Sequence, residues 1–174
     1  MLTALNYLEW RRGAERYIRP LQVKGEASVL TDDTYLKALN TLKSKYASEP
    51  ICAEVYLAQA RYAIEKQQQV NALQLCDEAI RLYPGYDRIN ALKNLREEIL
   101  APYLNVYAAD QAFPNEEIEL RASHKNLDGF TVRIYQAKKL IKEQHYSVIR
   151  PEDYRTHDTV FTFKAPELGA YVMR

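Results

Sequence analysis

The chain has 174 residues, of which 47% are hydrophobic and 27% are charged, so it can bury a core and does not have the composition of a disordered chain. Its 24 basic and 23 acidic residues give a net charge of +1, which lacks the basic excess that binds nucleic acid. No run of apolar residues is long enough to span a membrane, and the first residues do not form an intact secretory signal.

The first half of the chain has apolar residues at helical spacing. This pattern predicts five helices, over residues 3–18, 32–47, 51–67, 69–83 and 87–100. Thr31 is expected to cap the second helix, and Pro50 and Pro84 mark helix ends. Residues 20–30 follow neither a helical nor a strand period, so we expect a loop there.

Two cysteines, Cys52 and Cys76, are too few for a disulfide framework, and no C-x-x-C spacing points to a zinc or redox site. Free cysteine is among the residue types most often buried. We therefore predict that both are small buried residues on helices.

A repeat of 34 residues runs through the helical half. Segment 35–50 matches segment 69–84, with the pairs Ala38 and Ala72, Leu39 and Leu73, and Pro50 and Pro84. This period resembles the tetratricopeptide repeat, in which antiparallel helix pairs stack, and we expect about two repeats with an incomplete third as a cap. An ordinary helical bundle with a coincidental spacing is the alternative.

In tetratricopeptide-like stacks, the first helix of each repeat lines a concave surface. The resemblance therefore implies partner contact at Glu54, Leu57, Arg61, Ile64 and Glu65. Trp10 does not fit the repeat. It belongs either to a capping helix or to a contact patch for a neighbouring domain, since Trp, Tyr and Arg dominate such patches.

After Pro102 the apolar residues alternate with polar ones, which predicts short antiparallel strands in a sandwich. The predicted strands cover residues 104–109, 117–121, 130–135, 144–149, 159–164 and 170–174. Lys138, Lys139 and Lys142 are expected to lie in a solvated turn. The predicted fold class is α+β with two segregated domains, a helical-repeat domain at 1–101 and a β-sandwich at 102–174.

The second half also resembles the opening of a macroglobulin domain. The resemblance rests on the turn Phe113-Pro114-Asn115-Glu116, on Lys125-Asn126-Leu127, on a third strand that ends at Tyr135 and on the closing segment 166–172. Asn115 stands where that family usually has Gly, and Asn accepts a positive φ better than most residues. The family's domain usually has one strand more than we predict here. We therefore expect a segment of a longer protein with an unpaired sheet edge through which copies can associate.

Helical repeats followed by this β domain resemble the N-terminal region of bacterial alpha-2-macroglobulin-like proteins of the Bacteroides type. The resemblance implies a non-catalytic scaffold in a large cell-envelope protein, periplasmic or extracellular, with a signal or anchor upstream of Met1. The whole protein would trap proteases or defend the surface. The implied partners are other domains of the same long chain and proteases, with no nucleic acid and no membrane contact by this segment.

The search for catalytic chemistry in the sequence is negative. The thioester motif Cys-Gly-Glu-Gln, H-E-x-x-H, G-x-S-x-G and phosphate-binding loops are all missing. His124, His145 and His157 are interpreted as surface or structural residues, and we predict no enzyme activity, metal or cofactor. Two alternatives stay open: a self-contained tetratricopeptide adaptor with a peptide- or carbohydrate-binding β domain, and an accessory domain of a peptidase or other hydrolase.

Overall fold

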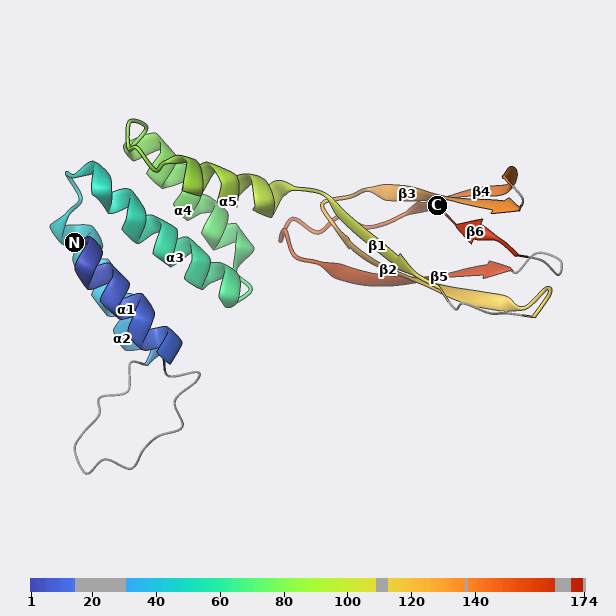
Figure 1. The fold of residues 1–174 in the computed structure, drawn as a ribbon, viewed down its shortest axis with the longest axis horizontal. Helices are drawn as coiled ribbons and strands as arrows, with labels where there is room; N and C mark the ends of the chain where they lie inside the picture. The colour runs from blue at the N-terminus through green and yellow to red at the C-terminus, as the bar shows by residue number, and fades with distance from the viewer. Residues whose placement is uncertain (15–30, 109–112, 137, 165–169, 174) are drawn as a thin grey trace, which may run out of the picture. The chain divides into compact units, whose positions relative to one another are not determined.

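The computed structural model describes residues 1–14, 31–108, 113–136, 138–164 and 170–173 (Figure 1). Within these residues, five α-helices and a short 3-10 helix precede six strands in two small antiparallel sheets, which is a mixed α+β fold. The chain divides into two compact units, Met1–Glu98 and Ile99–Arg174. We call them the helical unit and the β unit.

The helical unit follows the predicted helices with shifted ends. Its elements are α1 (Leu2–Ala14), α2 (Asp32–Lys45), η1 (Pro50–Cys52), α3 (Ala53–Glu65), α4 (Gln69–Leu82) and α5 (Asn90–Leu100), the last of which crosses the boundary of the unit. The first two residues of the third predicted helix belong to the 3-10 turn η1, in which Pro50 occupies the first position, where its missing N–H costs no hydrogen bond. The fifth begins at Asn90 and not at residue 87. Residues 15–18 and the predicted loop at 20–30 lie outside the described residues.

Local signals at two helix ends explain their positions. Thr31 caps α2 as predicted: its backbone is extended, and its hydroxyl oxygen accepts a hydrogen bond from the Thr34 amide at 3.3 Å. The chain turns between α3 and α4 at Gln67, which has a φ of 57°. That left-handed conformation is unusual for a residue other than Gly.

Small side chains allow α3 and α4 to pack closely. Ala60 on α3 and Ala72, Cys76 and Ala79 on α4 are all fully buried. The other face of α3 joins α1 and α2 in a cluster that includes Leu5, Tyr35, Leu39, Val55, Ala58 and Tyr62. Both cysteines are buried in helical segments, which confirms that prediction. Burial raises the pKa of the Cys76 thiol to about 11.

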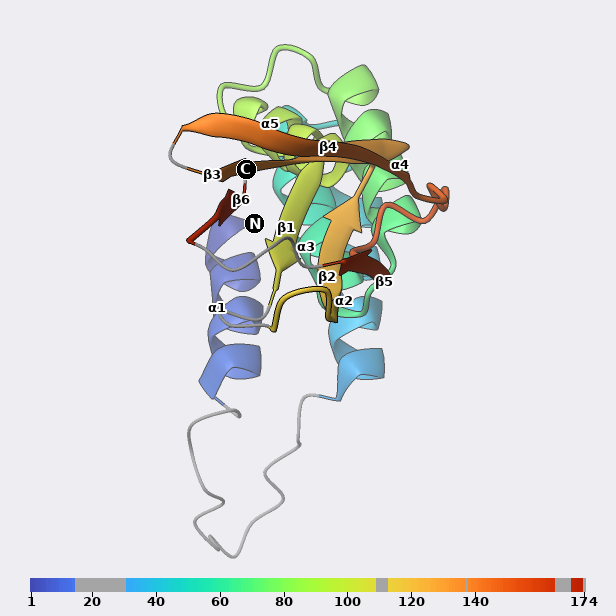
Figure 2. The same ribbon diagram turned by 90° about the vertical axis from the view of Figure 1, so that its right-hand side faces the viewer.

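The β unit contains two three-stranded sheets (Figures 1 and 2). The first sheet has the order β1-β2-β5 and the second has the order β4-β3-β6. The strands are β1 (Tyr103–Tyr107), β2 (Glu117–Lys125), β3 (Gly129–Gln136), β4 (Lys139–Ser147), β5 (His157–Lys164) and β6 (Val172–Met173). All pairings are antiparallel.

One hydrophobic core takes side chains from both sheets. Leu120 and Ala122 of β2 cluster with Phe130, Val132, Ile134 and Tyr146 of the second sheet. The Phe161 ring of β5 lies 5.4 Å from the Phe130 ring and 4.6 Å from the Tyr146 ring, measured between centroids. These aromatic contacts join the two sheets across the core.

The prediction of a solvated turn at Lys138, Lys139 and Lys142 is wrong for the last two residues, which lie in β4. The strand begins at Lys139 and ends at Ser147, earlier than the predicted segment 144–149. It is an edge strand whose side chains are mostly exposed, so its lysines remain in water. An edge strand does not need the apolar alternation that sequence reasoning looks for.

At two positions of the β unit, the backbone restricts which residue can be accommodated. Asn115 has a φ of 63°, the positive value that the sequence analysis expects it to tolerate, and the Phe113 amide donates to the Glu116 carboxylate at 2.8 Å. Gly129 opens β3 where a Cβ atom would lie 2.7 Å from the Tyr146 carbonyl oxygen. No other residue fits there without a shift of the backbone.

The core of the helical unit can be tested at Leu39, which is 0% exposed. We expect Leu39→Ala to lower the free energy of unfolding of this unit by about 2–5 kcal/mol, because the change leaves a cavity. Leu82→Ala is the matched control, since Leu82 is 43% exposed and its loss should cost less than about 1 kcal/mol. Urea unfolding followed by the helical circular dichroism signal measures both. Equal effects of the two variants would contradict the burial of Leu39.

Candidate functional site

A groove of about 270 Å³ lies between α1 and α3 in the helical unit, and we call it the α1–α3 groove. Each helix contributes a stripe of four residues with the same spacing. The stripes are Leu2, Leu5, Asn6 and Glu9 on α1, and Glu54, Leu57, Ala58 and Arg61 on α3. Residues at positions i, i+3, i+4 and i+7 share one face of a helix, so both stripes face the groove.

Glu54 is buried in the groove wall and has two partners. The Tyr86 hydroxyl donates to its carboxylate at 2.8 Å, and the Arg88 guanidinium lies 3.1 Å from the same oxygen. Burial, and next the bond to Glu54, raise the pKa of Tyr86 above its ordinary value. Glu54 therefore acts mainly as an anchor for the segment before α5.

Glu9 is held in a similar way from the other helix. The Tyr35 hydroxyl donates to its carboxylate at 2.7 Å, and Tyr35 is completely buried. Burial, and next the contact with Glu9, raise the pKa of Tyr35 well above the ordinary value of a tyrosine. Both carboxylates of the groove thus already accept a hydrogen bond from a tyrosine.

The cations of the groove are more available than its carboxylates. Arg61 is exposed, and it has no hydrogen bond or ion pair with any residue of the described ranges. Arg88 pairs with Glu54, yet its side chain is 63% exposed. Of the leucines that line the groove, Leu2 is 37% exposed, whereas Leu5 and Leu57 are buried. The groove therefore combines the exposed Leu2 with guanidinium donors that face solvent.

Three of the six residues predicted for partner contact line this groove: Glu54, Leu57 and Arg61. The other three do not line it. Ile64 is half-buried, Glu65 forms an ion pair with Arg12 of α1, and Trp10 is exposed with its ring stacked on Tyr7 at 6.2 Å between centroids.

Sequence reasoning missed the contributions of α1 and Arg88. The stripe Leu2, Leu5, Asn6 and Glu9 is readable in the sequence, but only packing of α1 against α3 turns it into a groove wall.

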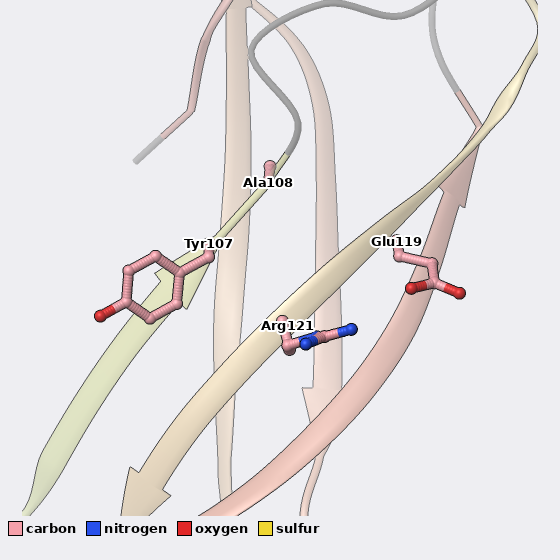
Figure 3. A pocket seen from close by; sticks show the side chains of 4 residues that line it. All are labelled: Tyr107, Ala108, Glu119 and Arg121. Carbon is pink, nitrogen blue, oxygen red and sulfur yellow. The ribbon is translucent and has the colours of Figure 1, made fainter.

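The β unit has a second hollow, of about 550 Å³, beside Tyr107, Ala108, Glu119 and Arg121 (Figure 3). Figure 3 shows the Tyr107 ring on the side of β1 away from β2, whereas the Arg121 and Glu119 side chains extend toward β5. The polar groups therefore do not converge on one point. This arrangement does not provide the few convergent polar groups that fix a small ligand.

The three histidines have separate partners. The ring of buried His124 lies 3.0 Å from the Thr159 hydroxyl, that of His145 lies 3.2 Å from the Thr131 hydroxyl, and that of His157 lies 2.9 Å from the Asp153 carboxylate. The bond to His157 is the main reason why the pKa of Asp153 is lowered. Within the described ranges, no group of three or more His, Cys, Asp or Glu side chains could hold a metal.

No helix in the part of the chain that the structure describes has both the length and the apolar character needed to cross a membrane. Comparison with known proteins gives no matching family model, no matching curated protein and no matching solved structure.

Buried tyrosines make the helical unit sensitive to alkali. Burial is the main reason why the pKa of Tyr83 rises to about 12, and burial also raises the pKa of Tyr35 and Tyr56. A pKa raised on folding contributes stability that is fully present below about pH 10, where an unfolded tyrosine begins to ionise, and is lost as the pH rises through the folded value.

We expect helical circular dichroism and tyrosinate absorbance to change together as the pH rises from about 10 through about 12, because buried tyrosines ionise when the unit unfolds. Tyr83→Phe should make the loss of helix less steep in pH, since it removes one of the ionisations. It should also lower the stability at neutral pH, because the bond to the Ala47 carbonyl oxygen is lost. Full ionisation of all tyrosines near pH 10 with an unchanged helical signal would contradict this prediction.

Proposed function

We propose that the chain is a non-catalytic protein-interaction segment whose helical unit binds a segment of another protein in the α1–α3 groove. The observation that carries this proposal is which charged groups of the groove already have partners within the chain. Its two carboxylates already accept hydrogen bonds from Tyr35 and Tyr86, while Arg61 and the mostly exposed Arg88 face solvent beside the exposed Leu2. The groove is thus complementary to a segment that carries apolar and acidic side chains.

The finer architecture that we propose is a stack of tetratricopeptide-like helix pairs followed by a β-sandwich. The 34-residue period supports the helix pairs, because its small positions Ala60, Ala72 and Ala79 are fully buried where α3 and α4 meet. The core shared by the two sheets supports the sandwich.

For the whole protein we propose a scaffold role in an alpha-2-macroglobulin-like protein of the bacterial cell envelope, with protease trapping or surface defence as its activity. The support is the resemblance of the ordered motifs between residues 113 and 135, together with the positive φ of Asn115 at the position where that family usually has Gly. The alternative of a peptide- or carbohydrate-binding β domain has less support, because the side chains beside Tyr107 diverge.

The scaffold proposal predicts the size and location of the native protein. An antibody raised against this chain should detect a band many times larger than 20.2 kDa in the envelope fraction of the source cells. A band near 20.2 kDa in the cytosolic fraction would contradict the scaffold role and favour the self-contained adaptor. Immunoblotting of membrane, periplasmic and cytosolic fractions distinguishes the two outcomes.

The groove can be tested by site-specific photo-crosslinking in the source cells. A photoreactive side chain at Asn6, which is exposed and lines the groove, should crosslink to a defined partner, whereas one at exposed Lys93 of α5, outside the groove lining, should not. Arg61→Glu should weaken the purified pair by about tenfold, because it places a carboxylate opposite an acidic segment.

Arg81→Glu is the matched control, since Arg81 is exposed on α4 and does not line the groove. We expect the control to bind like the unmodified chain. Unchanged binding by the Arg61 variant, or equal crosslinking from positions 6 and 93, would remove the groove from consideration.

A further inference from the structure

Strand β1 is the least protected long edge of the β unit. Within the described residues β1 pairs with β2 alone, and its sequence Tyr-Leu-Asn-Val-Tyr contains no charge. The other long edge strands carry charges: Asp158 and Lys164 in β5, and Lys139, Lys142 and Glu143 in β4. Charged side chains on an edge are a common protection against pairing with another chain.

The side chains of β1 also leave apolar surface in solvent on both faces of the sheet. Tyr103 is 45% exposed, Leu104 is 40% exposed and Tyr107 is 58% exposed. Since successive side chains of a strand point to opposite faces, the tyrosines lie on one face and Leu104 on the other. The Tyr107 ring projects on the side of β1 away from β2, where an added strand would lie (Figure 3).

The sequence of β1 is nearly the same in both directions, with Asn105 at its centre. If two copies pair antiparallel about a two-fold axis at Asn105, Tyr103 faces Tyr107 of the second copy, and Leu104 faces Val106. Each aromatic residue thus meets an aromatic one, and each aliphatic residue meets an aliphatic one. Such pairs are the favourable cross-strand pairs of an antiparallel sheet.

We propose that two copies of the chain associate through β1, in antiparallel register about Asn105. The partner is a second copy because the self-complementary order of β1 suits an isologous two-fold interface. The product is a continuous sheet in the order β5-β2-β1-β1-β2-β5, and the added strand covers the exposed part of Leu104. This pairing uses the β unit alone and does not depend on the α1–α3 groove.

The neighbouring strand supports the same register. In β2, Lys125 lies opposite Tyr103 and Arg121 lies opposite Tyr107. The dimer therefore has a row in which the tyrosine pair lies between a lysine of one copy and an arginine of the other. In this row no like charges face each other across the two-fold axis. A five-residue pairing is small, so we expect a reversible dimer.

Substitutions at Asn105 test this register directly, because residue 105 faces itself across the axis. Asn105→Lys and Asn105→Asp each place two like charges opposite one another, and each should weaken the dimer by about tenfold or more. An equimolar mixture of the two variants should associate again, because the charges are then opposite. Within one copy, residue 105 lies opposite Ser123, and its side-chain amide donates a hydrogen bond to the Tyr107 hydroxyl at 2.5 Å. Both variants change this bond, so recovery in the mixture shows that charge, and not the loss of the bond, sets the association.

Sedimentation velocity over a concentration series measures the association of each Asn105 variant and of their mixture. One variant in the mixture is fluorescently labelled. Thr162→Lys is the matched control on the exposed side of β5 and should leave the dimer unchanged. Amide hydrogen exchange of the unmodified chain gives a second measurement that does not depend on the folding of a variant. Protection of residues 103–107 should rise with protein concentration.

Three results would overturn the proposal. The first is an unmodified chain that stays monomeric at every concentration. The second is association of each Asn105 variant alone as strong as that of the unmodified chain. The third is a mixture of the two folded variants that fails to associate.

Discussion

Helix α3 is buried along ten of its thirteen residues, and its buried side chains Glu54 and Gln59 both bond to neighbouring segments. Glu54 has Tyr86 and Arg88, and the Gln59 side-chain amide donates to Asn40 of α2 at 2.8 Å. A buried polar group without a partner costs roughly several kcal/mol, which is a large fraction of the stability of a small domain. These bonds therefore restrict where α2 and the segment before α5 can lie against α3.

Tyrosine supplies most of these links, because it fills space with its ring and donates a hydrogen bond from its end. Four tyrosines join segments that are far apart in the sequence: Tyr35 to Glu9, Tyr56 to Glu78, Tyr83 to the Ala47 carbonyl and Tyr86 to Glu54. Three of the four acceptors are carboxylates. The same links that hold the helices together thus occupy an oxygen of each groove carboxylate and leave Arg61, together with the exposed part of Arg88, for the proposed partner.

Sequence patterns predict the helices and most of the strand segments, because these depend on neighbours within a few residues. Residue type predicts the Thr31 cap and the burial of both cysteines. The sequence does not predict that Glu54 is buried. Its partner Tyr86 lies 32 residues away, and no residue near Glu54 in the sequence indicates the contact. The spacing of Glu54, Leu57 and Arg61 places them on one face, but the opposite wall requires the packing of α1. The lysines of β4 were missed because an edge strand in water carries no apolar alternation.

The two proposed surfaces differ in the kind of partner they select. The α1–α3 groove presents guanidinium groups beside apolar residues, so it favours a segment of different composition from its own walls. Strand β1 has the same residue classes in both directions, so it favours its own copy. Because each surface lies within a single unit, one can be altered without changing the other. A chain with one surface of each kind can hold two copies of a partner in one assembly, where linked binding sites give a higher overall affinity than either site alone.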